Sequence, residues 1–394
     1  MKKNNIVIPY LKEGIFLTTL FVITFSLFLF NSCRERVQTK CKDCLIIHAS
    51  LEEDEVSLEK LFHKIEIIPL ETTDNSLIQS IKGYDYLNGK HYIFDQGQAI
   101  LFCFDEEGNY LNRIAKKGQG PGEYKLIYDF ALNPQKGLIH MLSPFKKILS
   151  YDFDGKFVKT YDLTDEKFNS IQKMEILDEN SFVVWTSSKD NQDWIYIISQ
   201  ETGQIENSFL QNYYLYNTWS SSVFHTYNND IYFSLHLFNI VYKVTREGLT
   251  EDYEWDFGNK TMDISRYDLI TSMRNINKDS ETVEQKLISG EIGYEFWRNY
   301  QNQDYYFALL RFNRKYSKHV FYNKKTGKST FFHLTTEGIQ LYPLYFTDDY
   351  MIGMLFYDHR EKLLDCPLLD EANKQKLLSF KYDDNPYLVR YYFK

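Results

Sequence analysis

The feature that most constrains the fold is a hairpin that recurs five times along the chain. Each copy has an apolar strand, a turn with glycine and a second strand, as in ILSYDFDGKFVKTYDL and HVFYNKKTGKSTFFHL. The first four copies are evenly spaced, at roughly the 40–50 residues of a four-stranded propeller blade, and a solenoid of helix pairs would not place a strand hairpin in each repeat. The turn glycines are Gly108, Gly155, Gly203, Gly248 and Gly327, and only the last interval is much longer than the others.

The long fourth interval has a visible cause. Residues 258–292 contain MDISRYDLITSMRN and SETVEQKLISG, whose apolar residues have helical spacing. We expect this segment to be a helical insertion between two blades. Each hairpin is preceded by a further strand pair, such as SVFHTYN with DIYFSLH, so the repeats predict blades of four strands.

The sixth blade is incomplete in chain order. Its inner strands are expected at 342–346 and 350–356, followed by a helical segment at 359–380 and one strand at 387–393. The isolated strand at 64–70 can supply the missing partner, and pairing the terminal strands removes two open sheet edges. We therefore predict an all-β fold: a six-bladed β-propeller with two helical insertions on one face, closed by its N- and C-terminal strands.

Three motifs resemble those of a known family. They are GxGPGEY between the first two blades, the DxxGxxxxxI hairpins and the terminal DDNPYLVRYYFK. Together they are similar to the six-bladed β-propeller lipoproteins abundant in Bacteroidetes, which are themselves similar to NHL-repeat propellers. The resemblance covers residues 60–394 and implies the fold. It implies no particular activity, because this fold hosts both binding proteins and enzymes.

The glycine-rich stretch KKGQGPGEY, residues 116–124, is better suited to architecture than to phosphate binding. It lacks the G-x-x-x-x-G-K-[ST] of a P-loop, and Glu123 stands where a dinucleotide fingerprint needs its third glycine. We expect it to carry the chain from the outer strand of the first blade to the inner strand of the second. Glycine supplies positive φ there and proline fixes φ, while Glu123 and Tyr124 are placed to add a hydrogen bond and an aromatic plug.

Composition supports a large strand-rich fold and argues against nucleic acid as a partner. The chain has 394 residues, 43% of them hydrophobic and 17% aromatic, and aromatic residues favour strands. Its net charge is −9, and no basic run exceeds a pair of lysines such as Lys146 and Lys147. Phosphates would be repelled by such a chain.

The N-terminus resembles an export signal. Lys2, Lys3 and Lys12 precede an apolar run at 15–30, which has the length of a signal-peptide core rather than of a membrane span. Ser32 before Cys33 resembles a bacterial lipoprotein signal, in which the cysteine is lipidated and becomes the first mature residue, although Phe30 departs from the usual leucine. The alternative is an uncleaved membrane anchor with an incidental Cys33.

Either alternative carries the rest of the chain out of the cytoplasm. We expect a signal peptide at 1–32, a lipid-anchored tether at 33–60 and the propeller at 61–394. The predicted location is the cell envelope, on the outer membrane through the N-terminal lipid. Because no acidic run follows Cys33, we expect the propeller to face the periplasm. In the tether, Cys41 and Cys44 form a lone C-x-x-C, for which a local disulfide or two free thiols are more plausible than zinc.

Loops on one face are the expected place for ligand contacts. In an up-and-down blade, the loops between second and third strands and those between blades emerge on the same side. Both helical insertions and the segment QNYYLYNTWSSS fall there, and aromatic residues dominate binding anchors. We name Trp219, Tyr216 and Trp297 as aromatic anchors and Arg298 as a charged contact near the channel mouth. The alternative is that these aromatic residues only pack the insertions onto the ring.

Catalytic motifs are sparse. The nine histidines include no H-E-x-x-H, and no G-x-S-x-G is present. Asp129 and His225, with Arg298 as an anion contact, are the channel residues that could serve a metal site, although each can equally be a hydrogen-bonded channel residue. We expect no cofactor.

Two functions follow from the sequence. The first is a non-catalytic binding or scaffold module for a peptide, glycan or partner protein. The second is a propeller hydrolase or lyase with a metal-assisted site at the channel mouth. Three Asp, Glu, His or Asn side chains brought to one point in the channel would favour the enzyme, and an apolar or dispersed lining would favour the binding module.

Overall fold

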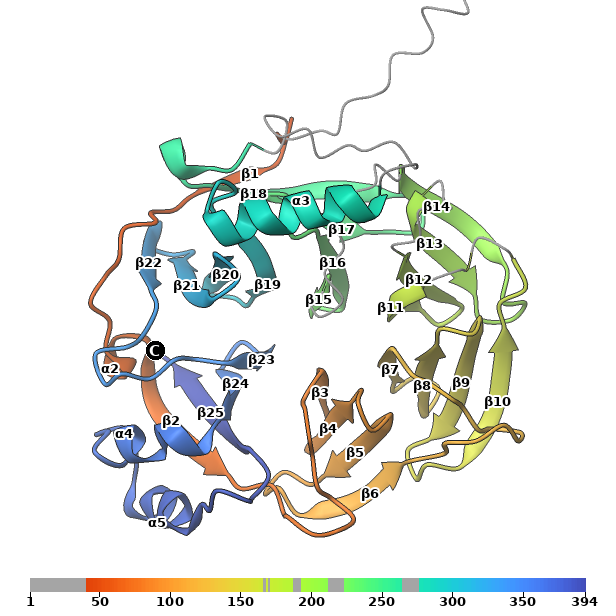
Figure 1. The fold of residues 1–394 in the computed structure, drawn as a ribbon, viewed down its shortest axis with the longest axis horizontal. Helices are drawn as coiled ribbons and strands as arrows, with labels where there is room; N and C mark the ends of the chain where they lie inside the picture. Colours follow the sequence, from red (N-terminus) through yellow and green to blue (C-terminus); the bar gives the residue numbers. More distant parts are fainter. Residues whose placement is uncertain (1–39, 166–167, 169–170, 187–192, 212–222, 264–275) are drawn as a thin grey trace, which may run out of the picture. The chain divides into compact units, whose positions relative to one another are not determined.

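A computed structural model of the chain describes residues 40–165, 168, 171–186, 193–211, 223–263 and 276–394. Within these residues, six sheets stand around a central axis, each running from an inner strand near the axis to an outer strand at the rim (Figure 1). The predicted six-bladed β-propeller is therefore confirmed.

Blades 1 to 3 follow chain order from the inner strand outward. Blade 1 consists of β3 (Gly83–Leu87), β4 (Lys90–Asp95), β5 (Ile100–Phe104) and β6 (Tyr110–Ile114). Blade 2 consists of β7 (Asp129–Asn133), β8 (Leu138–Ser143), β9 (Lys147–Asp152) and β10 (Phe157–Asp162). Blade 3 consists of β11 (Ile171–Asp178), β12 (Ser181–Thr186), β13 (Asp193–Ser199) and β14 (Ile205–Gln211).

Blades 4 and 6 each contain a strand from the N-terminal part of the chain. Blade 4 consists of β15 (Phe224–Tyr227), β16 (Asp230–Ser234), β17 (Ile240–Val244) and β18 (Leu249–Asp256), with β1 (Leu45–His48) outermost. Blade 5 consists of β19 (Glu295–Gln301), β20 (Tyr305–Phe312), β21 (Tyr316–Asn323) and β22 (Lys328–Phe332). Blade 6 consists of β23 (Pro343–Phe346), β24 (Tyr350–Leu355), β25 (Tyr387–Phe393) and β2 (Phe62–Ile68).

The terminal strands close the ring as predicted. β25 lies between β24 and β2, and it is antiparallel to both. In the register of the closing pair, Ile65 lies opposite Tyr391 and Ile67 opposite Val389. The chain therefore completes blade 6 with strands that come from opposite ends of the propeller sequence.

The five predicted hairpins are the third and fourth strands of blades 1 to 5, and their glycines do more than turn the chain. Gly108 has φ +91°, and a Cβ added there would lie 2.0 Å from the carbonyl oxygen of Pro69, which follows the outer strand of blade 6. The glycine turn of each of the first four blades thus meets the outer strand of the blade before it. In blades 2 to 4, a Cβ added at Gly155, Gly203 or Gly248 would lie 3.5 Å from Ile114, 2.8 Å from the Asp162 carbonyl oxygen and 3.8 Å from Phe209, respectively.

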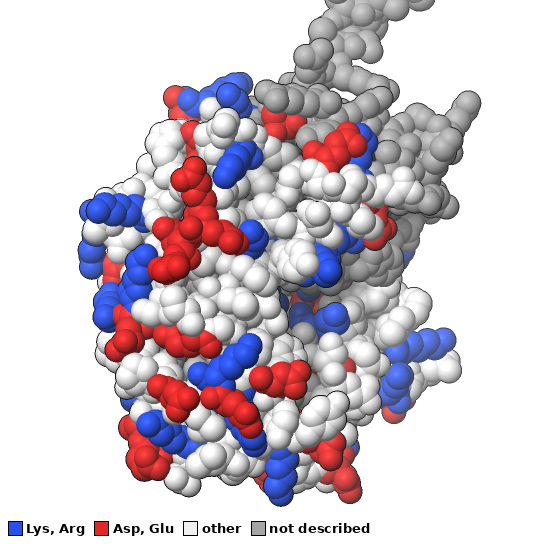
Figure 2. Space-filling model, turned by 60° about the vertical axis from the view of Figure 1, so that its left-hand side comes forward, with Lys and Arg blue, Asp and Glu red and all other residues white. Residues whose placement is uncertain are grey.

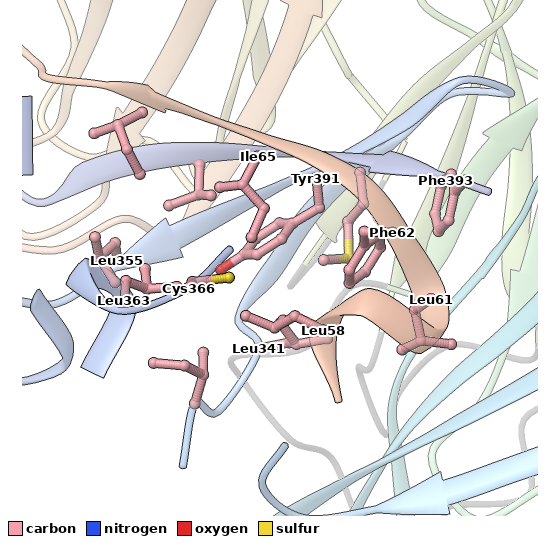
Figure 3. Close-up of a cluster of buried hydrophobic side chains, with 14 of the residues drawn as sticks. Leu58, Leu61, Phe62, Ile65, Leu341, Leu355, Leu363, Cys366, Tyr391 and Phe393 are labelled. Atoms are coloured by element: carbon pink, nitrogen blue, oxygen red, sulfur yellow. The ribbon is translucent and has the colours of Figure 1, made fainter. Parts of the chain in front are cut away.

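Apolar residues from facing blades form the core, because alternate side chains of a strand point to opposite neighbours. One cluster joins blades 5 and 6 with the short helix α2 (Leu58–Leu61) (Figure 3). In it, the ring of Phe62 lies 5.1 Å from that of Tyr391 and 5.6 Å from that of Phe393. Cys366 and Cys103 are both buried and free, as small core residues would be.

The segment predicted as a tether contains ordered structure on the rim. β1 pairs with β18 in parallel, with Ile46 opposite Glu254, and Cys41 and Cys44 form a disulfide just ahead of it. Residues 49–57 then pass outside β22 toward α2 (Figure 1). Several contacts tie this passage to blade 5: Asp54 N donates to the carbonyl oxygen of Phe331 (2.7 Å), Phe331 N donates to Asp54 Oδ2 (2.9 Å), and Ser50 N donates to Ser329 Oγ (2.9 Å). We call residues 41–61 the N-terminal strap.

The joint KKGQGPGEY carries the chain from β6 to β7. The Glu123 carboxylate accepts from Gly120 N at 2.8 Å, and the Tyr124 hydroxyl donates to Ala99 O at 2.8 Å. The Tyr124 ring is buried between blades 1 and 2. Gly122 has φ +70°, and a Cβ there would overlap the ring of Phe157. The hydrogen bond and the aromatic plug expected from Glu123 and Tyr124 are both present.

Apart from α2, the described α-helices lie in the two connections that were expected to carry insertions. Between β18 and β19 are a 3₁₀ turn (η2, Gly258–Lys260) and α3 (Ile276–Ser289). Between β24 and β25 are η4 (Tyr357–His359), α4 (Arg360–Leu364) and α5 (Glu371–Ser379), and Asn373 of α5 accepts a hydrogen bond from Ile67 N in β2. Because successive strands alternate in direction, both connections lie at the same end of the strands. Within the described residues, no helix combines the length and apolar character needed to cross a membrane.

Candidate functional site

A cavity of about 130 Å³ lies where the inner strands of all six blades approach one another. Several of its residues stand at the beginning of β3, β7 and β15, so the cavity lies toward the end of the channel at which the connections between blades arrive. A volume of this size holds several water molecules or a small ligand. The side chains used below are Asp85 from β3, Asp129 from β7, Lys173 and Glu175 from β11, His225 from β15 and Arg298 from β19.

Two carboxyl groups of the cavity have raised pKa values. Burial raises the pKa of Asp85 to about 7, opposed by a hydrogen bond from Tyr86 N to its Oδ1. Burial also raises the pKa of Glu175 well above its usual range, and the nearby acidic Asp129 and Asp85 raise it further, while Lys173 lowers it. Both side chains keep part of their surface open to the channel but are surrounded by protein, which disfavours the charged form.

Asp129 has a structural role between two blades. Its Oδ2 accepts a hydrogen bond from Met174 N at 2.9 Å, and its Oδ1 lies 3.2 Å from Lys173 Nζ. These contacts link the start of β7 to β11, so both carboxylate oxygens are already engaged. Burial raises the pKa of Asp129, and the Lys173 ammonium opposes that shift.

His225 is a neutral, buried side chain. It is 5% exposed and its ring stacks on Tyr232, with centroids 5.1 Å apart. Burial lowers the pKa of His225 to about 3, and the Lys324 charge acts in the same direction. Among the described residues its buried Nε2 has no hydrogen-bond partner, which is costly for a polar atom away from water.

Arg298 lines the same cavity from blade 5. Its Nη1 donates to the Pro343 carbonyl oxygen at 2.8 Å and to the Tyr300 hydroxyl at 3.0 Å, and that hydroxyl donates in turn to Leu344 O. These bonds attach the guanidinium to the inner strand of blade 6. Over the part of the chain that the structure describes, Arg298 forms no ion pair, so its charge is available to an acidic group of a ligand.

The structure thus brings Asp129, His225 and Arg298 to one cavity, as their predicted positions on inner strands required. It does not make them a metal centre: among the described residues, no group of three or more His, Cys, Asp or Glu side chains is placed to hold a metal ion. Asp85 and Glu175 were not singled out from the sequence. Their only signal is a carboxylate within an inner-strand segment, GYDYL or IQKMEILD, and that signal does not show which side chains reach the cavity.

Trp297 is partly buried against the core between blades 5 and 6. The guanidinium carbon of Arg311 lies 3.9 Å from the centre of its ring, and Arg311 is ion-paired with Glu295. One side of the indole is therefore covered by the protein itself. Trp219, Tyr216 and Cys33 lie outside the described residues, so their predicted roles stay predictions.

On the face shown in Figure 2, Lys and Arg side chains are interspersed with Asp and Glu. The described residues on that face therefore form no extended patch of one sign. The cavity also combines both signs of charge, since Asp85, Asp129 and Glu175 line it together with Lys82, Lys173 and Arg298.

Fold and cavity together define a six-bladed β-propeller with a charged central cavity. The family model described as "Domain of unknown function (DUF4934)" matches residues 45–392, and the chain belongs to this family. No curated protein matches the sequence.

Two solved structures from Bacteroides are similar to the chain. One, from Bacteroides fragilis, is named as a presumed exported protein; it has a TM-score of 0.70 and 18% identity, with 89% of this chain and 99% of that chain covered. Another, a member of the DUF4221 family from Bacteroides vulgatus, has a TM-score of 0.53 and 11% identity, with 87% and 99% covered. At these identities the likeness concerns the fold alone.

Proposed function

We propose that this protein is a lipid-anchored, non-catalytic binding module of the cell envelope, which takes a peptide, glycan or partner protein at the mouth of its central channel. The observation that carries the proposal is Arg298, a cavity-lining arginine that no described carboxylate neutralises. Buried or half-buried arginines are normally paired, and one left open toward a cavity suits the recognition of an acidic group. Asp129 and Lys173 engage each other, so they are less suited to ligand contact.

The location rests on the N-terminal sequence. The apolar run followed by Cys33 fits a lipoprotein signal, and the similar Bacteroides fragilis protein is named as a presumed exported protein. Two acyl chains on Cys33 would give stable anchoring, at about 0.8 kcal/mol per buried CH₂. Cys33→Ala should leave the precursor uncleaved or release the protein from the membrane fraction. Normal processing and membrane retention in this variant would contradict lipidation.

The ligand face is tested with the full-length protein in detergent. Partners captured from an envelope extract are identified by mass spectrometry, and the affinity of a purified partner is then measured for Arg298→Ala. Truncation of a central contact typically costs ~2 kcal/mol, so we expect about thirtyfold weaker binding. The same measurement on Trp219→Ala, Tyr216→Ala and Trp297→Ala tests the aromatic anchors.

Tyr300→Phe is the matched control for Arg298→Ala. It removes the hydroxyl that bonds to Arg298 and to Leu344 O but keeps the guanidinium charge. We expect its affinity to stay close to that of the unmodified protein. Unchanged affinity in Arg298→Ala, with a lower melting temperature instead, would show that Arg298 only holds blades 5 and 6 together.

A further inference from the structure

Asp85 and Glu175 are two carboxyl groups in one cavity, and neither has a countercharge of its own. Over the described chain, the Asp85 carboxylate accepts one hydrogen bond, from Tyr86 N, and forms no ion pair. The Glu175 carboxylate has neither a hydrogen bond nor an ion pair. Two lysines line the cavity: Lys173 is engaged with Asp129, and Lys82 forms no ion pair with a described carboxylate. A buried carboxyl group without a partner costs stability, and such costs concentrate at functional sites.

The aromatic residues of the lining also suit a cation. Aromatic faces attract ammonium groups, most strongly where water is excluded. His225 adds a neutral imidazole whose Nε2 has no partner among the described residues, and such a nitrogen can accept a hydrogen bond from an ammonium group. The aromatic side chains of the cavity are Tyr84, Phe130, Phe224, Tyr300, Tyr345 and Phe346.

We infer that this cavity binds a small organic cation that carries a protonated amine, with Asp85 and Glu175 supplying the countercharge. The inference rests on the proposed function, because it adds a second recognised group, a protonated amine, to the acidic group that Arg298 is proposed to bind. A divalent metal fits the lining less well, since hard cations require six or more oxygen ligands and the described residues lack even a group of three suitable side chains. An anion at this position would meet the carboxyl groups of Asp85 and Glu175.

The opposite charge in the cavity does not neutralise this acidic pair. The charged groups that act on Glu175 are Asp129, Asp85 and Lys173, and Arg298 is not among them. Arg298 is instead held by the inner strand of blade 6 through Pro343. The acidic pair and Arg298 are thus separate positions. A ligand can place its amine beside Asp85 and Glu175 without Arg298 repelling it from that position.

The test compares four-carbon probes on the full-length protein in detergent at pH 8, where an alkylamine is protonated. Dissociation constants of n-butylamine and n-butanol are measured by ligand-observed NMR. We expect butylamine to bind at least tenfold more tightly than butanol. Equal binding of butylamine and butanol would overturn the inference.

Variants then locate the preference. Asp85→Asn combined with Glu175→Gln keeps the shape of both side chains and should reduce butylamine binding to the level of butanol. Glu179→Gln, which changes an exposed glutamate just after β11, should keep the full preference. Glu175→Gln alone provides a second measurement, with at least a threefold loss expected. An amine preference that survives the double variant would place the amine elsewhere and refute the site.

This experiment separates the inference from the proposed function. If partner binding depends on Arg298 but butylamine shows no preference, the inference fails and the binding face stands. If butylamine binds through Asp85 and Glu175 while no partner depends on Arg298, the proposed face fails and the amine site stands.

Discussion

At the scale of single residues, the buried carboxyl groups in the channel lower the stability of the folded protein when they are charged. The folded protein holds a proton on Asp85 up to about pH 7, whereas the unfolded chain releases it near the ordinary pKa of about 3.8. Between these two values the folded state binds more protons than the unfolded state. The free energy of unfolding therefore falls as pH rises through this window, and the loss is complete above it.

Replacing this group by a neutral amide should remove the loss. We expect Asp85→Asn to raise the free energy of unfolding at pH 8 by roughly 1–2 kcal/mol, because the side chain keeps partial access to water, and to give a smaller gain at pH 5. Denaturant titrations of both proteins at pH 5, 6, 7 and 8 measure the difference. The buried neutral histidines contribute equally to the stability of both proteins, so their contribution cancels in the difference.

Glu179→Gln controls for the loss of one negative charge, since this glutamate is exposed. Its effect should stay within about 0.5 kcal/mol at every pH, as is usual for surface substitutions. A difference between Asp85→Asn and the unmodified protein that does not change with pH would contradict the raised pKa of Asp85.

At the scale of elements, the repeated glycine turn joins one blade to the blade before it. Gly108 combines positive φ with the close approach of the Pro69 carbonyl, whereas Gly327 has positive φ and only the Tyr322 hydroxyl nearby, at 3.6 Å. A substitution at Gly327 therefore measures the cost of positive φ alone, whereas one at Gly108 measures that cost together with crowding between blades.

Gly108→Ala should cost more than Gly327→Ala. Placing a side chain at positive φ costs about 1 kcal/mol or somewhat more, which is all we expect at Gly327. At Gly108 the Cβ must also displace the backbone of blade 6, so we expect a total of about 3 kcal/mol or more, in the range of severe steric overlap. Chemical denaturation of the two variants checks the order. Equal losses would show that the turn moves away from Pro69 without cost.

The same elements show what the sequence could and could not predict. The five hairpins were predictable because their signal is local: a glycine turn between two apolar strands. β1 was not, because LIIH becomes a strand only by pairing with β18, which lies in the fourth blade and far along the chain. Likewise, Asp85 and Glu175 reach the cavity because of the positions of six separate strands. Arg298 could be predicted as a channel residue because it stands on an inner strand beside an insertion. Its hydrogen bond to Pro343 could not be predicted, because it depends on how blades 5 and 6 pack.

At the scale of the whole molecule, stability depends on ring closure. β25 is the third strand of blade 6 and bonds to strands on both sides, so its removal leaves β2 without a partner and opens two edges. Deleting residues 387–394 should cost well over about 5 kcal/mol, enough to leave most of the protein unfolded. Circular dichroism and thermal melting of the truncated protein measure this loss.

Deleting residues 1–48 is the matched comparison. It removes β1, which adds a fifth strand outside an otherwise complete blade, and leaves six sheets of four strands. We expect this protein to stay folded with a moderately lower melting temperature. A C-terminal deletion that melts like the N-terminal one would show that the closing pair is dispensable.

The N-terminal strap also determines how the ring responds to mechanical load. Any pull on the chain ahead of Cys41 reaches the disulfide and β1 first, then the contacts of Ser50 and Asp54 on blade 5, and only afterwards the closing sheet. Because β1 lies alongside β18 with several hydrogen bonds in parallel, force along the strand must break them together rather than one by one. The strap thus protects the closing pair: β1 and the contacts on blade 5 bear the tension before it reaches β2 and β25.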